Sequence, residues 1–410
     1  MGYFSRSGPA SVKGPCVACC QADHAKDDQL SKASAARIAV LTSQRTAAND
    51  AVAPSGRVGS DCAAQARRLA PVTQRFDRYR QALPSARAAS DLNELGDKPG
   101  DAPSTKPCLT RLPVRAAPLN AALGVNPDTL TDQDLRNDDT GFRAALYRDE
   151  GTGKMILVPR DTEPDSLVDW QTNTRNGGGD DTPQYAAMRK LTQRLQSNHQ
   201  VFDIAGYSKG GGIAQEGGLV NTLAQVRVFN SSGLADASLA RTGQPNFDDL
   251  ISRTKAFSAD GDFLTYMNGT TDPGQAITNA HFLRQELAGQ GRGVNPIAIK
   301  VRNPAMRGVD DPFFEGDKQA YLAELDRHID SMQAAFDTGG TVPTFPPVRA
   351  ASKETIVNSV TSVGKMLGAG SDQPTLGKLA QHKMSAVLDA MEADVADDRK
   401  TLSNFLASCG

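Results

Sequence analysis

A serine framed by glycines is the residue in this sequence best suited to chemistry. Residues 206–210 read Gly-Tyr-Ser-Lys-Gly, which matches the G-x-S-x-G pattern of a nucleophilic serine. An apolar run precedes this motif and a small-residue segment follows it, so we predict a strand, a sharp turn and a helix. Such a turn projects the hydroxyl of Ser208, and Gly206 and Gly210 leave room for the neighbouring backbone. The pattern therefore predicts a serine nucleophile.

An anion-binding turn is the alternative for the same residues. Small residues at a strand-to-helix junction suit anions, and Lys209 would assist them. The spacing matches neither the phosphate-binding G-x-x-x-x-G-K-[ST] loop nor the dinucleotide-binding G-x-G-x-x-G loop. We therefore favour the nucleophile.

A serine nucleophile needs a base, and the sequence has five histidines. Where a serine lies on a strand-to-helix turn, the acid and then the histidine follow it in the chain. This order leaves His281, His328 and His382. The segment around His382 reads as a polar helix, which is typical of a surface histidine. We predict His328 as the base, since it follows an apolar run and a loop, and keep His281 as the alternative.

The acid has several candidates in loops that follow apolar runs. Asp260 and Asp262 follow the run Lys-Ala-Phe-Ser, and Asp236 follows Val-Phe-Asn-Ser-Ser-Gly-Leu. Any of them is able to hold the imidazole in its productive tautomer. The residues alone leave this choice open.

Three segments together resemble a known family. They are ILVPRDTEPDSLVDWQTN, FDIAGYSKGGGIA and GDFLTY, in that order along the chain. From about residue 128 to 337 the sequence resembles the class 3 (fungal-type) lipases and related bacterial lipase-like effectors of the α/β-hydrolase superfamily. The resemblance implies that Asp262 is the acid and that Thr162, with the backbone N–H of Lys209, forms the oxyanion hole. It also implies that Asp169 and Trp170 order the adjoining loop.

The sequence departs from that family at the positions around the nucleophile. Asp161 stands where the family has glycine, so a carboxylate lies near the place where negative charge develops and would oppose catalysis unless it points away. Tyr207 and Lys209 replace the common His and Leu. Lys209 either changes the surroundings of the serine, reaches a phosphate, or lies in solvent.

The elements that must position these residues read as alternating strands and helices. Residues 142–159 predict a hairpin, and residues 182–198 predict a helix with Tyr185, Met188, Leu191 and Leu195 on one face. Thr131 and Asp134 predict a capped helix start. This order indicates an α/β-hydrolase-type, mainly parallel sheet with helices on both faces, plus N-terminal and C-terminal helical extensions.

The chain divides by composition into three parts. Residues 1–118 form a basic, Ala-rich arm that is partly helical and flexible in places, 119–345 the catalytic domain, and 346–410 a helical extension. Residues 1–120 contain 17 Lys+Arg and 10 Asp+Glu, a balance of +7 against a net charge of −2 for the whole chain. This near-neutral total gives no reason to expect nucleic-acid binding.

The six cysteines lie outside the region predicted to hold the chemistry. Cys16, Cys19 and Cys20 resemble part of a zinc motif, but a structural site needs four ligands, usually as two spaced pairs. Disulfide, free-thiol and lipid-modified states stay open alternatives. We expect no metal and no organic cofactor.

The sequence thus predicts a serine ester hydrolase of the lipase or phospholipase A type. An esterase, thioesterase or peptidase on the same fold is the alternative, as is a non-catalytic interaction protein with a relict fold. The absence of an apolar leader or spanning segment predicts cytoplasmic synthesis. The resemblance to effectors implies export by a specialised secretion system, with a secretion partner or an immunity protein. A lipid substrate implies transient contact with a membrane surface.

Overall fold

The structure is a computed structural model, and it describes most of the chain in several stretches. The described residues are 16–48, 57–95, 103–162, 169, 172–173, 175–176, 180–242, 244–259, 297–299, 326–327, 330–331, 334–335, 338 and 384–409. None of the helices in these stretches has the length and apolar composition that a bilayer crossing requires.

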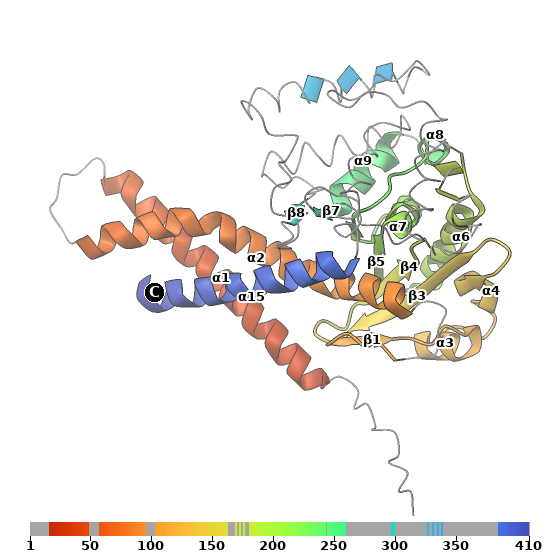
Figure 1. Ribbon diagram of the computed structural model, residues 1–410, viewed down its shortest axis with the longest axis horizontal. Helices are drawn as coiled ribbons and strands as arrows, with labels where there is room; N and C mark the ends of the chain where they lie inside the picture. The colour runs from red at the N-terminus through yellow and green to blue at the C-terminus, as the bar shows by residue number, and fades with distance from the viewer. Residues whose placement is uncertain are drawn as a thin grey trace, which may run out of the picture.

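The central sheet has the strand order β1-β3-β4-β5-β6-β7-β8, with β2 paired to β3 (Figure 1). The strands are β1 Leu109–Arg111, β2 Arg136–Asn137, β3 Phe142–Asp149, β4 Met155–Pro159, β5 Phe202–Tyr207, β6 Val226–Phe229, β7 Thr254–Ala259 and β8 Ile297–Ile299. The helices are α1 Val17–Ala48, α2 Arg57–Leu95, α3 Ala116–Leu123, α4 Asp132–Leu135, α6 Pro183–Ser197, α7 Lys209–Val220, α8 Asp236–Thr242, α9 Gln244–Arg253 and α15 Met384–Cys409.

The sheet is antiparallel at one side and parallel over the rest. β3 and β4 form the predicted hairpin, and β4 to β8 pair in parallel, with Leu157 opposite Ile204 and Ile204 opposite Val226. The capped helix start is also confirmed, because Thr131 and Asp134 form a capping box at α4. The predicted α/β class with a mainly parallel sheet is therefore confirmed.

Each face of the sheet is covered by its own helices because strand side chains alternate between faces. Leu157, Ile204 and Val226 pack on the side of α6 and α7, where Met188 and Leu191 are fully buried. On the other face lie large side chains of α2, α15 and the strands. They are Phe76, Tyr79, Ala205, Tyr207, Phe229, Phe257, Met384, Val387 and Met391.

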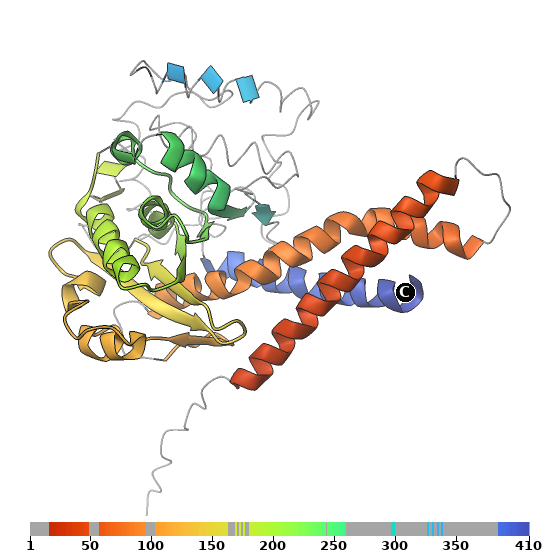
Figure 2. The same ribbon diagram turned by 180° about the vertical axis from the view of Figure 1, so that it is seen from behind.

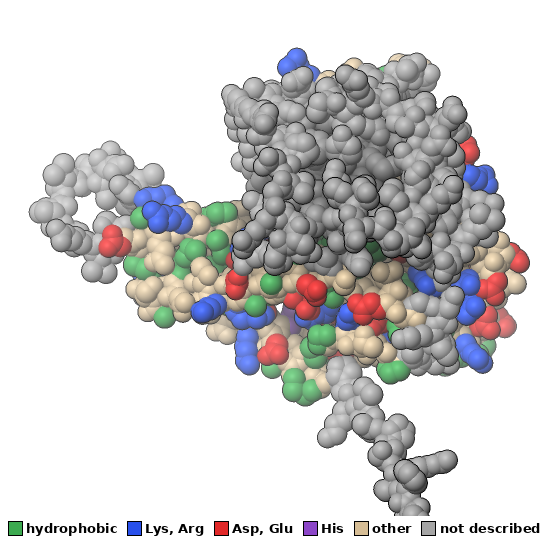
Figure 3. All heavy atoms as spheres, in the orientation of Figure 1, with side chains coloured by type: hydrophobic (Ala, Val, Ile, Leu, Met, Phe, Trp, Pro, Cys, Tyr) green, Lys and Arg blue, Asp and Glu red, His purple; other side chains and the backbone are tan. Residues whose placement is uncertain are grey.

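Helices α1, α2 and α15 form a helical arm that extends beyond the sheet (Figures 1 and 2). A small core lies between them, made by Ile38, Leu41, Ala66, Leu69, Phe405 and Cys409. Arg75 of α2 makes two hydrogen bonds to the carboxylate of Asp398 of α15, at 2.9 and 2.5 Å. Charges of both signs lie along the described surface of this arm (Figure 3). The predicted N- and C-terminal helical extensions are thus confirmed.

All six cysteines are paired, in the bonds Cys16–Cys19, Cys20–Cys108 and Cys62–Cys409. The second bond joins the start of α1 to the residue before β1. The third joins α2 to the end of α15. The cysteines are therefore in the disulfide state, and these bonds tie both helical extensions into one unit with the sheet.

Candidate functional site

Ser208 lies at the tight turn between β5 and α7, as the motif predicts. Its backbone has φ 53° and ψ −126°, which is a strained conformation for a residue with a side chain and costs about 1–3 kcal/mol. The surrounding backbone holds this conformation. The N–H of Ser208 donates to Phe229 O at 3.0 Å, and its carbonyl accepts from the N–H of Gly211 and of Ser232, both at 2.9 Å. The strain is thus maintained by neighbours on β6 and α7.

The two glycines of the motif are required by close backbone contacts. A Cβ on Gly206 would lie 2.1 Å from the carbonyl oxygen of Gly210, and a Cβ on Gly210 would lie 2.6 Å from that of Pro159. Both distances are impossible for real Cβ atoms and backbone. The first turn of α7 therefore rests directly on the end of β4, where the chain continues toward Thr162.

Lys209, next to the candidate nucleophile, is buried in an ion pair. Its Nζ lies 2.5 Å from Oδ1 of Asp169, and the two side chains are 4% and 3% exposed. Gln184 of α6 donates to the same oxygen at 2.6 Å and to the carbonyl of Thr140 at 3.0 Å. Of the roles considered for Lys209, solvent exposure is therefore wrong. The side chain links the start of α7 to Asp169, which follows β4 in the chain.

Electrostatics at Lys209 involve a second carboxylate. Burial lowers the pKa of the Lys209 ammonium, while the carboxylates of Asp169 and Asp161 act in the opposite direction. Asp161 is the residue that replaces the glycine of the resembled family. Its charge is thus close enough to the Lys209 ammonium to interact with it, so part of its effect on the site is compensated.

The end of β4 brings Thr162 to the edge of the sheet that carries Ser208. β4 and β5 are parallel neighbours, so the residues that follow them leave the sheet at the same edge. This carboxyl edge is where ligands bind in open α/β sheets. Asn173 donates from Nδ2 to Oγ1 of Thr162 at 3.0 Å, which fixes the threonine side chain.

Several predicted site residues lie outside the described residues. They are the acid Asp262, the other loop candidate Asp260, the base His328, its alternative His281, and Trp170. The third acid candidate, Asp236, is the first residue of α8. The triad and the oxyanion hole therefore stay predictions, while the positions of Ser208, Lys209, Thr162, Gly206 and Gly210 are described.

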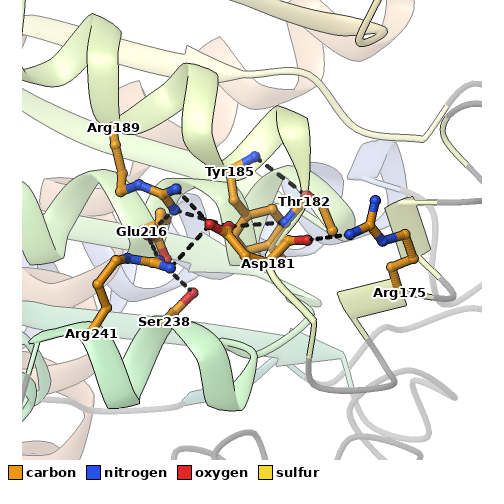
Figure 4. Close-up of polar contacts among 8 residues, drawn as sticks. All are labelled: Arg175, Asp181, Thr182, Tyr185, Arg189, Glu216, Ser238 and Arg241. Carbon is orange, nitrogen blue, oxygen red and sulfur yellow. Dashed lines mark hydrogen bonds and ion pairs between the residues drawn. The ribbon is translucent and has the colours of Figure 1, made fainter.

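A buried ionic cluster holds the helices around the turn, and sequence reasoning missed it (Figure 4). Glu216 of α7 is 0% exposed and pairs with Arg189 of α6 at 2.7 Å and Arg241 of α8 at 2.6 Å. Both arginines also pair with Asp181, at 2.7 and 3.1 Å. The cluster connects three helices and thereby fixes the helix that begins directly after Ser208. A charged residue within an otherwise small, apolar helix is the signal that would have found it.

Comparison with known protein families finds a match over the central part of the chain. Residues 120–301 match the Phospholipase-like family model, described as a Tle-like phospholipase domain. No curated protein matches the chain. The match supports a lipid-hydrolysing function of the phospholipase type. The matched range contains Thr162, Ser208 and Lys209, whereas the closer resemblance to class 3 lipases stays a prediction.

Proposed function

We propose that this protein is a serine hydrolase that cleaves an acyl ester of a phospholipid, with Ser208 as the nucleophile. The observation that carries the proposal is the strained backbone of Ser208 between β5 and α7, at the carboxyl edge of the sheet. Strain of this kind persists where the surrounding structure maintains it, and it is concentrated at functional sites. The match of residues 120–301 to a phospholipase domain supports the substrate class.

In the proposed reaction Ser208 Oγ attacks the carbonyl carbon of the ester. His328 takes the hydroxyl proton and gives it to the departing alcohol, and Asp262 orients the imidazole. The acyl group stays on Ser208 until a water, activated by the same histidine, attacks the acyl-enzyme and releases the fatty acid. The reaction requires neither a metal nor an organic cofactor.

The oxyanion is stabilised, in this proposal, by donors at the start of α7 and the end of β4. The backbone N–H of Lys209 lies at the positive end of the α7 dipole, which favours negative charge. Thr162 supplies the second donor, and Asn173 orients its side chain. The Lys209–Asp169 pair holds these two segments together and reduces the effect of the Asp161 carboxylate.

The test is fatty-acid release from phospholipid vesicles and, in parallel, from emulsified triglyceride. We expect release from phospholipid and a loss of at least about a thousandfold in Ser208→Ala. Ser403→Ala, an exposed serine of α15, is the matched control and should be fully active. A fluorophosphonate should label the wild type and leave Ser208→Ala unlabelled. A wild type that neither hydrolyses nor is labelled would contradict the proposal and favour the relict fold.

The base is tested separately by two histidine variants. We expect His328→Ala to lose hydrolysis by about a thousandfold or more, because no general base remains for Ser208. His281→Ala should retain activity. The reverse pattern in the same vesicle assay would assign the base to His281.

A further inference from the structure

A polar cavity lies at the opposite edge of the sheet from Ser208. Its volume is about 280 Å³, and its walls come from α1, α2, the β3–β4 hairpin and the amino ends of β5 and β6. The charged side chains that line it include Asp28, Arg80, Asp149, Lys154, Asp203 and Arg227. Along β5, Asp203 and Ser208 are five residues apart, or roughly 16 Å at the usual rise per residue. The cavity is therefore separate from the candidate active site.

The acceptors of this cavity are already occupied by the protein. Asp28 accepts a hydrogen bond from Arg80 at 3.0 Å and pairs with Lys32. Asp149 accepts from the hydroxyl of Thr152 at 2.5 Å and from the N–H of Gly151 at 3.1 Å. Asp203 accepts from Arg227 at 2.9 Å. Each carboxylate thus has donors within the fold. They have little capacity left for a cation.

The donors of the cavity, in contrast, keep capacity for a ligand. The side chains of Arg80 and Arg227 are 8% and 9% exposed. Within the described residues Arg80 donates hydrogen bonds from Nη2, to Asp28 and Asp77, and Arg227 donates from Nη1, to Asp203. Lys154, at the mouth, forms no ion pair within the described stretches. Each guanidinium therefore keeps an Nη group for an acceptor in the cavity.

The surroundings of Arg227 add further positive charge. Lys255 lies opposite Arg227 in the β6–β7 register and faces the same side of the sheet. Burial lowers the pKa of Lys255, the charges of Arg227 and Arg78 lower it further, and the carboxylates of Asp77 and Asp203 act in the opposite direction. An anion bound at Arg227 would add to the negative charge that stabilises the Lys255 ammonium.

We infer that this cavity is a second ligand site that binds a phosphate group through Arg80, Lys154 and Arg227. Guanidinium and ammonium donors are the usual partners of phosphate oxygens. The cavity volume is near the lower end of the range for small-molecule pockets, about 300–1,000 Å³. It is also several times the volume of one water molecule, about 30 Å³. An organic phosphate the size of glycerol 3-phosphate fits this space, as does inorganic phosphate.

A disulfide fixes the wall that α1 contributes to the cavity. Cys20, one turn before His24 on α1, is bonded to Cys108. A Cβ on Gly151, in the turn after Asp149, would lie 3.3 Å from His24 Cβ and 3.5 Å from the carbonyl of Cys20. The hairpin and the first turns of α1 are therefore in direct contact, and the cavity has a defined shape in the oxidised chain.

Isothermal titration calorimetry of the full oxidised chain tests this site, with inorganic phosphate and glycerol 3-phosphate as two separate titrants. We expect saturable binding of at least one titrant at one site per chain. Affinity should fall roughly tenfold or more in both Lys154→Ala and Arg227→Lys. The first removes a cationic donor, and the second replaces the forked guanidinium with a single ammonium beside Asp203. Arg227→Lys keeps a cation beside Asp203, and Lys154 is exposed, so both variants should fold.

Two control variants show whether the titrant binds in this cavity or elsewhere on the chain. Lys400→Ala removes an exposed lysine of α15, and Ser208→Ala changes the candidate active site; both should bind like the wild type. The inference is overturned by no saturable binding of either titrant, by equal affinity in Lys154→Ala, or by a loss in Ser208→Ala. Binding of glycerol 3-phosphate alone identifies an organic phosphate as the ligand, and binding of both identifies the phosphate group as sufficient.

Discussion

The two faces of the sheet are held in different ways. On the α6/α7 face, the helix after Ser208 approaches both α6 and the sheet through glycines. A Cβ on Gly217 would lie 2.5 Å from Met188 Cε, and one on Gly218 would lie 2.6 Å from Val226 Cγ2. The same face contains the ionic cluster around Glu216. On the α2/α15 face, large rings fill the interface, with Phe229 stacked on Phe257 at 5.3 Å and Tyr79 at the edge of Phe257 at 6.1 Å.

This difference indicates that the two faces stabilise the sheet through different kinds of contact. The helix that carries the proposed oxyanion donor approaches closely and in one orientation, which small residues and directional ion pairs provide. The other face is packed by large aromatic rings, and a disulfide joins α2 to α15 at its outer end. Perturbing one face should therefore change the molecule differently from perturbing the other.

The largest effect should come from breaking the ionic cluster. In Arg189→Met/Arg241→Met, the fully buried carboxylate of Glu216 loses both cations and stays in an apolar environment. We expect the free energy of unfolding to fall by about 3–5 kcal/mol, measured by urea denaturation at neutral pH.

A triple variant tests whether the charge itself is responsible. Adding Glu216→Met removes the uncompensated carboxylate, so most of the lost stability should return. If the triple variant is as unstable as the double variant, the effect comes from lost packing rather than from the buried charge.

An intermediate effect should follow removal of the disulfide at the outer end of the helical arm. Cys62 and Cys409 are 347 residues apart, and we expect Cys62→Ser/Cys409→Ser to lower the free energy of unfolding by about 2–4 kcal/mol. Hydrolysis at low temperature should be unchanged, because Ser208 lies in the other part of the molecule.

Another disulfide of the same chain supplies the matched control. Cys16 and Cys19 are only 3 residues apart, so their bond restricts the unfolded chain far less. Cys16→Ser/Cys19→Ser should shift the same urea transition very little. An equal loss in both variants would contradict the role assigned to the long-range bond.

The smallest effect should be a pH-dependent contribution of Asp181. Burial raises the pKa of this carboxyl, but the hydrogen bond and charge of Arg189 and the charge of Arg241 outweigh it and bring the pKa below 3.8. A lowered carboxyl pKa stabilises the fold above the unfolded value, and the contribution is lost as pH falls through the folded value.

The comparison of Asp181→Asn with the wild type measures this contribution. The carboxylate is 36% exposed, so we expect a difference of at most about 1 kcal/mol at pH 7. The difference should shrink as the pH falls below 3.8. A difference that persists in strong acid would indicate a role other than its charge.

Local patterns were sufficient to predict the elements that carry the nucleophile. The apolar run before Ser208, the flanking glycines and the hairpin over residues 142–159 each depend on neighbours in the sequence, and each is confirmed as structure. The class of the fold followed from the alternation of such elements. Periodicity also identified the buried face of α6, where Tyr185 and Leu195 are each 1% exposed.

Contacts between distant residues were beyond the same reasoning. The Lys209–Asp169 pair joins residues 40 apart in the chain, and the Glu216 cluster includes residues of three helices, so no spacing rule reveals either. Six cysteines allow about fifteen pairings, and sequence alone does not choose among them. The alternatives for Lys209 and for the cysteines stayed open for this reason.

The bond between Cys62 and Cys409 also determines how the oxidised chain responds to tension. A pull applied to Cys62 and Cys409 is carried by two sulfur atoms and not by the hydrogen bonds of the sheet. The residues between the two cysteines bear none of this force, because the disulfide closes them into a covalent loop. The same closure means that the oxidised chain, even when denatured, cannot pass through a narrow pore in single file.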